Sequence, residues 1–220
     1  MKNNLLWAGL VLFLVFSTNI DAQFNAGIIG GVNIATFDAE DDEISSRVLW
    51  GAGFILSYDL NENFSLQTEP MYLKKGGIRE QQDDNPKLTL SQDFIEIPIL
   101  LNFGYGEKSR FHLVAGPSFG FTISSDLEAD ISGIMFEADI IDLTESIDVG
   151  LCFGGGFSTE FSPGLLFLEV KYTMGLTNLS KTGTFTAKAG ALEIQGDLDE
   201  DESEYKSRGI EIMVGYKIPI

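Results

Sequence analysis

The sequence has little of the chemistry on which most enzymes and metalloproteins depend. Its 220 residues include one histidine, His112, and one cysteine, Cys152. A single cysteine excludes an internal disulfide and a cysteine-rich zinc site, and a single histidine excludes a histidine-cluster metal site. We therefore expect no resident metal and no cofactor.

Basic residues are also scarce. The chain has 14 Lys and Arg against 33 Asp and Glu, which gives a formal net charge of −19 and a pI of about 4.2. Such a chain repels phosphate backbones, so we exclude nucleic acid as a partner. The hydrophobic share of 44% is too high for a disordered chain, and the length suits one domain.

Long apolar runs are missing after the first twenty residues. The run from Leu5 to Phe16 follows Lys2 and precedes the small residue Ala22. This layout predicts a signal peptide over residues 1–22, and a domain over 23–220 that works outside the cytoplasm. A membrane anchor is the alternative, but the run is shorter than the ~20 residues that span a bilayer.

The rest of the sequence alternates between apolar and small or polar residues with the period of two that is typical of β-strands. Eight segments show this pattern: 24–36, 48–60, 64–75, 90–103, 110–123, 147–161, 166–174 and 210–218. In each of them one face is apolar and the other carries glycines, polar residues and isolated charges. The sequence therefore predicts an all-β protein.

The connections between these segments are short and long in turn. Short turns at 61–63, 104–109 and 162–164 alternate with long links at 38–47, 76–87, 124–146 and 175–206. This plan is typical of an outer-membrane barrel with periplasmic turns and extracellular loops. We predict an eight-stranded antiparallel up-and-down transmembrane β-barrel. A soluble periplasmic or secreted β-barrel binding protein is the alternative, and neither strand face is polar enough to favour it.

Aromatic residues on the apolar faces gather at two levels, as the interfacial belts of a membrane barrel would. Those predicted near the loops are Trp50, Tyr72, Phe121 and Tyr172, and those near the turns are Tyr58, Phe64, Phe103, Phe111, Phe161 and Tyr216.

The opposite faces place ten ionisable side chains inside the predicted barrel: Glu69, Glu96, Arg110, His112, Asp148, Glu160, Glu169, Lys171, Glu211 and Lys217. Side chains fill the interior of an eight-stranded barrel, and buried charges need partners. We expect a lumen polar network of salt bridges and hydrogen bonds. A narrow cation-preferring, porin-like channel and a small polar-ligand site are the alternatives.

Catalysis would have to use His112, the single imidazole. A hydrolase needs a nucleophile, a histidine and an orienting acid or amide, and Ser65 and Ser158 are the candidate nucleophiles on the inner face. We interpret His112 as a member of the lumen network and expect no enzyme. A lipid-modifying hydrolase stays as an alternative.

The acidic residues concentrate in the four long links, most densely at 38–43 and 197–204. Acidic loops are usually solvated surface. The functional interpretation is that they hold divalent cations against lipid headgroups or bind a basic protein partner. We expect a non-catalytic structural, binding or interaction role for these extracellular loops.

Four sequence motifs resemble the PorT-like outer-membrane β-barrel family. They are Gly116-Pro117-Ser118-Phe119-Gly120-Phe121, the stretch 64–69 with Tyr72 and Lys75-Gly76, Phe94-Ile95-Glu96-Ile97-Pro98, and the stretch 171–178. The resemblance covers nearly all of the predicted mature chain. It implies a location in the outer membrane of a Gram-negative cell. Some members of that family are linked to protein secretion and gliding.

Overall fold

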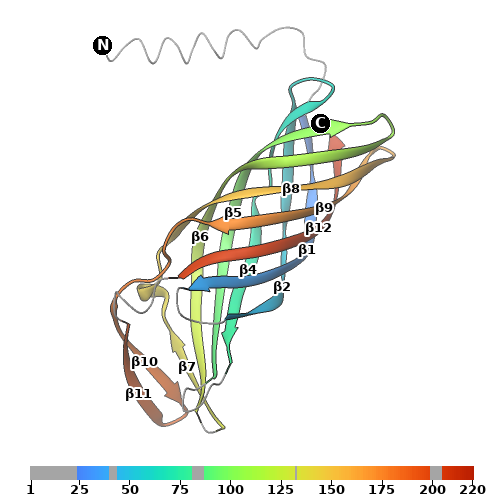
Figure 1. Ribbon diagram of the computed structural model, residues 1–220. Coiled ribbons are helices and arrows are strands. Elements are labelled where there is room, and N and C mark those ends of the chain that lie inside the picture. Colours follow the sequence, from blue (N-terminus) through green and yellow to red (C-terminus); the bar gives the residue numbers. More distant parts are fainter. Residues whose placement is uncertain (1–23, 40–43, 81–86, 132, 199–204) are drawn as a thin grey trace, which may run out of the picture.

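The computed structural model describes residues 24–39, 44–80, 87–131, 133–198 and 205–220, and the predicted signal peptide lies outside these residues (Figure 1). The described elements are β1 (Phe24–Ala39), β2 (Ile44–Asp59), β3 (Phe64–Thr68), β4 (Met71–Arg79), β5 (Lys87–Tyr105), β6 (Ser109–Ile131), β7 (Ile134–Asp139), the 3-10 helix η1 (Ile141–Leu143), β8 (Ile147–Phe161), β9 (Gly164–Gly175), β10 (Gly183–Ala189), β11 (Leu192–Leu198) and β12 (Tyr205–Pro219).

The strands form a closed antiparallel barrel, because the last strand, β12, pairs with β1 from Asn25↔Pro219 to Ala39↔Tyr205. Around the ring the order is β1, β2, β3 with β4, β5, β6, β8, β9 and β12. β3 and β4 together occupy one strand position of the barrel, since both pair with β2 on one side and β5 on the other. The predicted eight-stranded barrel is confirmed, and its third strand is interrupted at Glu69 and Pro70.

The outer surface of the barrel is apolar, whereas the interior holds most of the polar side chains together with small apolar clusters. Outward side chains such as Ile28, Phe54 and Leu113 are each more than 60% exposed, whereas inward ones such as Asn33 and Gln67 are buried. Water would not favour this apolar surface, but a lipid bilayer does, and closure satisfies the backbone groups there. No helix in the described part is long and apolar enough to cross a membrane.

Paired aromatic rings mark the two edges of the apolar surface, at the levels that the sequence predicts. At the turn end the ring pairs are Phe24–Tyr58, Phe64–Phe103, Phe111–Phe157 and Phe161–Tyr216. At the loop end they are Trp50–Tyr72 and Phe153–Tyr172. These belts delimit the part of the barrel that lies in lipid.

The prediction that 124–146 and 175–206 are loops is wrong. β6 continues to Ile131 and turns into β7, and 175–206 contains the hairpin β10–β11. Together, residues 124–143 and 183–198 form a projection, the β-arm, at the end of the barrel away from the C-terminus (Figure 1). Its buried face includes the small residues Ala129, Ala138 and Ala187 around Phe136. Because these residues are small, the apolar alternation in the sequence is weak there.

The lipid-facing surface gives a test of the membrane placement. We expect Leu168→Arg, on β9 between the aromatic belts, to destabilise the folded barrel by about 2–4 kcal/mol, because an arginine is costly near the middle of a bilayer. Urea titration of the protein refolded into lipid vesicles measures this change. Leu192→Arg on β11 is the control, since its side chain is equally exposed, 54% against 52%, but lies on the β-arm. Equal costs for both substitutions would contradict the placement.

Candidate functional site

The centre of the lumen is organised around the ammonium group of Lys171, which comes from β9. Lys171 is fully enclosed and forms an ion pair with Glu69. Its Nζ also lies 3.2 Å from Oε2 of Glu211 and 3.7 Å from Oε1 of Glu169. Three carboxylates from three strand positions of the barrel thus share one cation, and their remaining oxygens need further hydrogen-bond donors. Two such donors are Gln67, whose Nε2 donates to Glu69, and Thr173, whose hydroxyl donates to Glu211.

A second buried cluster lies nearer the β-arm end and surrounds Lys75 of β4. Its Nζ is 2.8 Å from Oε2 of Glu96 and 3.3 Å from Oδ2 of Asp148. The Ser118 hydroxyl donates to Glu96 at 2.7 Å, and the Ser207 hydroxyl donates to Asp148 at 2.5 Å. The two clusters together hold more carboxylates than lysines.

An apolar group closes the lumen above the Lys75 cluster. Phe37, Phe94 and Leu179 are each buried and pack together, with Tyr205 against them. The Lys75 ammonium lies 4.6 Å from the centroid of the Phe94 ring, so the apolar group directly covers the charged one. We call Phe37, Phe94 and Leu179 the apolar plug. Leu179 comes from the link after β9, which the alternation pattern did not assign to the barrel interior.

His112 is bound to a carboxylate on the turn side of the Lys171 cluster. Its Nε2 lies 3.0 Å from Oε2 of Glu169. Ser65 and Ser158 line a cavity together with His112, and among the described residues neither hydroxyl forms a hydrogen bond with it. Cys152 is buried against Leu100 and Val114 on the lumen wall.

The β-arm presents an unusual row of carboxylates. In the register of β6 and β7, Asp126 lies opposite Asp139 and Glu128 lies opposite Glu137. The stretch 124–146 contains no Lys or Arg. We call Asp126, Glu128, Asp130, Glu137 and Asp139 the acidic face. Partial burial together with the charge of Asp139 raises the pKa of Asp126 above its ordinary value. The nearest strand beyond, β10, supplies Lys188, which forms its ion pair with Glu193, 3.3 Å away.

The sequence matches the outer membrane protein beta-barrel domain family over residues 17–181. The chain belongs to this family. It lies in the lipid bilayer of the outer membrane of a Gram-negative cell. In such barrels the short turns face the periplasm and the long links face the outside. We therefore expect the β-arm to be extracellular.

Solved structures of other outer-membrane barrels are similar in outline. Neisserial surface protein A is 12% identical, with a TM-score of 0.46, and the match covers 90% of this chain and 97% of that one. The attachment invasion locus protein Ail of Yersinia pestis is 10% identical, with a TM-score of 0.44 and coverages of 89% and 99%. OprG from Pseudomonas aeruginosa is 10% identical, with a TM-score of 0.42 and coverages of 90% and 96%. No curated protein matches the sequence.

The structure brings together most of the ten ionisable residues predicted for the lumen. Those that are buried and in mutual contact through the two lysine clusters are Glu69, Glu96, His112, Asp148, Glu169, Lys171 and Glu211. Arg110 and Lys217 are half-buried in a cavity at the periplasmic end, and Glu160 is exposed near that end. Glu160 forms no ion pair among the described residues, because the strand carries it beyond the enclosed part of the lumen.

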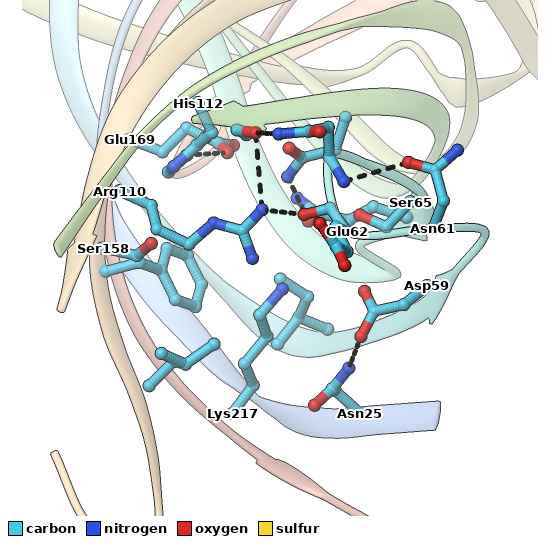
Figure 2. Close-up of a pocket in the computed structure, with 17 residues that line it drawn as sticks. Asn25, Asp59, Asn61, Glu62, Ser65, Arg110, His112, Ser158, Glu169 and Lys217 are labelled. Carbon is cyan, nitrogen blue, oxygen red and sulfur yellow. Dashed lines mark hydrogen bonds and ion pairs between the residues drawn. The ribbon is translucent and has the colours of Figure 1, made fainter. Parts of the chain in front are cut away.

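The same cavity opens toward the periplasmic turn between β2 and β3, where Asn61, Glu62 and Asn63 are exposed (Figure 2). Within the described residues no group of three or more His, Cys, Asp or Glu side chains is arranged to hold a metal ion. The acid-dense stretches predicted at 38–43 and 197–204 lie mostly outside the described residues.

The Lys171 cluster predicts a large stability effect. Lys171→Met leaves three buried carboxylates without their shared cation, and we expect it to destabilise the refolded barrel by about 3–5 kcal/mol in urea titration. Adding Glu69→Gln to this variant removes one of the orphaned charges and is expected to restore part of the loss. Lys181→Met, which breaks a half-exposed pair with Glu145, is the control, with an expected change below about 1 kcal/mol. A small change in Lys171→Met would contradict the central role of this ammonium.

The acidic face predicts a pH effect on the β-arm. Because the pKa of Asp126 is raised in the folded arm, its negative charge destabilises the arm once the pH rises through that pKa. We expect Asp126→Asn to stabilise the β6–β7 pairing at neutral pH by about 0.2–1 kcal/mol, and to have no effect well below the ordinary aspartate pKa of about 3.9, where the carboxyl is protonated in both states. Hydrogen exchange of the β7 amides across this pH range measures it. A stabilisation that persists at low pH would refute the electrostatic origin.

Proposed function

We propose that this protein is a non-catalytic outer-membrane binding protein whose extracellular β-arm captures a basic polypeptide through its acidic face. The observation that carries this proposal is the pairing of like charges, Asp126 with Asp139 and Glu128 with Glu137, on neighbouring strands. Carboxylates directly opposite each other destabilise a sheet. A cationic partner would turn this cost into a favourable interaction.

The surroundings of the acidic face support a partner from outside the chain. The nearby cations form their ion pairs with carboxylates outside the acidic face. The pairs are Lys74 with Asp93 at 2.9 Å, Lys87, which lies opposite Asp130 in the register, with Glu80 at 3.6 Å, and Lys188, which lies opposite Glu137, with Glu193 at 3.3 Å. Opposite charge across an interface speeds association and selects the partner by its charge. A divalent cation is the second ligand class that we expected for acidic loops, and a basic chain suits a row of carboxylates spread along two strands better than a single ion does.

The lumen supports binding at the surface over transport or hydrolysis. The apolar plug and the two lysine clusters occupy the described interior beyond the periplasmic cavity, which supports surface binding over a narrow cation-preferring channel. His112 is engaged by Glu169 rather than by a serine. We infer membership of the PorT-like branch from the four sequence motifs alone.

Binding of fluorescent deca-lysine to vesicles that contain the refolded protein tests the proposal. We expect saturable binding that weakens as salt is added, because the contact is electrostatic. The triple variant Asp126→Asn, Glu137→Gln, Asp139→Asn is expected to bind at least about tenfold more weakly, since several charge-assisted contacts are lost.

Glu193→Gln is the matched control, because it removes one carboxylate from the same β-arm but outside the acidic face. It is expected to bind deca-lysine nearly as the unaltered protein does. An equal loss of deca-lysine affinity in the control and in the triple variant would mean that binding depends only on the net charge of the protein. Unchanged binding in the triple variant would refute the proposal, and discrete cation-selective steps in planar-bilayer recordings would favour the channel.

A further inference from the structure

The periplasmic end of the lumen holds two cations that differ from the lysines deeper in the barrel. Arg110 donates from Nη2 to the backbone carbonyl oxygens of Glu62 and Gly104, at 2.5 Å and 3.4 Å. Lys217 donates from Nζ to the Ser57 hydroxyl at 3.2 Å. Among the described residues neither side chain forms an ion pair with a carboxylate, whereas Lys75 and Lys171 each have at least two.

Both cations keep unused donors. A guanidinium offers five N–H groups and an ammonium three, so most of the donors of Arg110 and all but one of those of Lys217 have no protein acceptor in the described part. Figure 2 shows the two side chains reaching from different strands into one cavity. Two half-buried cations around one space favour an anion between them.

One carboxylate in this cavity is also without a cationic partner. Asp59, at the end of β2, accepts a hydrogen bond from Nδ2 of Asn25 at 3.1 Å and forms no ion pair among the described residues. The cavity therefore presents unpaired charges of both signs, on Arg110 and Lys217 at one side and on Asp59 at the other (Figure 2). The other acids of the wall are Glu169, which is engaged by His112, and Glu62, which is exposed on the turn between β2 and β3.

We propose that this cavity, the periplasmic vestibule, binds a small zwitterion of the amino-acid type. Its carboxylate would accept hydrogen bonds from Arg110 and Lys217, and its ammonium group would donate to Asp59. Amide side chains of Asn25 and Asn63 lie on the rim and suit a polar ligand. This binding is independent of the acidic face, which lies at the other end of the barrel.

The shape of the vestibule agrees with a small ligand. Its cavity volume is about 70 Å³, below the ~300–1,000 Å³ typical of drug-sized ligand sites, so it suits a ligand of only a few heavy atoms. Gly104 contributes to this space, because a Cβ at that position would lie 3.1 Å from Nη2 and 3.3 Å from Nε of Arg110. The absence of a side chain there leaves the guanidinium free to face the cavity.

Three small probes of different charge test the proposal: L-alanine, propionate, which lacks the ammonium group, and ethylamine, which lacks the carboxylate. Each is titrated into the refolded full-length barrel in detergent micelles, and binding is followed by the NMR resonances of the periplasmic turns. We expect saturable shifts with L-alanine, and binding at least about tenfold weaker for propionate and for ethylamine, since each loses one charge-assisted contact.

Variants assign the two halves of the site. Lys217→Met is expected to weaken the binding of L-alanine at least about tenfold and to leave the binding of ethylamine unchanged. The isosteric Asp59→Asn is expected to weaken the binding of L-alanine and to leave the binding of propionate unchanged. Glu160→Gln, at the same end but outside the cavity, is the control and is expected to bind L-alanine normally. No saturable shift with L-alanine, or propionate binding as tightly as L-alanine, would overturn the proposal. Deca-lysine binding is unaffected by either result.

Discussion

The pairing of β12 with β1 is the interaction on which the rest of this structure depends. It joins the two ends of the sheet along nearly all of both strands, so the ring has no open edge strand in lipid. A ring of eight strands is narrow, and its inward side chains must touch one another. The ion pairs of Lys171 and Lys75 follow from that narrowness, because a carboxylate held there has little water and needs a cation or a donor from another strand.

The two ends of the barrel carry different charged groups. Toward the outside, the apolar plug covers the Lys75 cluster, and the carboxylates of the β-arm stand beyond it with few cations nearby. Toward the periplasm, Arg110 and Lys217 face a cavity that solvent enters. The buried middle separates these two surfaces, so a ligand at one end has no direct electrostatic contact with a ligand at the other. Under the two proposals, the molecule offers two independent binding faces in one membrane-embedded barrel.

The fold was predictable from the sequence because lipid imposes a strict period of two. The alternation of inward and outward residues alone placed Glu69, Glu96 and Lys171 on the inner face. This alternation does not show which residues face each other across the lumen, so it could not distinguish Lys171, which has ion pairs, from Lys217, which has none among the described residues. It also could not find Leu179, which enters the lumen from a link rather than a strand.

The β-arm escaped prediction for a different physical reason. Its strands bury alanines, and a sheet that lies outside the membrane can carry carboxylates on its solvent side. The two faces of these strands therefore differ little in hydrophobicity, and the alternation is weak there. A signal was still present in 124–146, where acidic residues recur and no lysine or arginine interrupts them. Charge of one sign at strand spacing, rather than apolar alternation, would have identified the acidic face.

The apolar plug has a consequence for the cell that carries this protein. An open barrel lets solutes leak, and every added copy weakens the permeability barrier of the outer membrane. Here Phe37, Phe94 and Leu179 are buried together inside the barrel. In a binding protein that is closed at this level, as we propose, a further copy adds a binding surface without adding a leak, so the number of copies can rise until crowding in the membrane, rather than loss of the barrier, sets the limit.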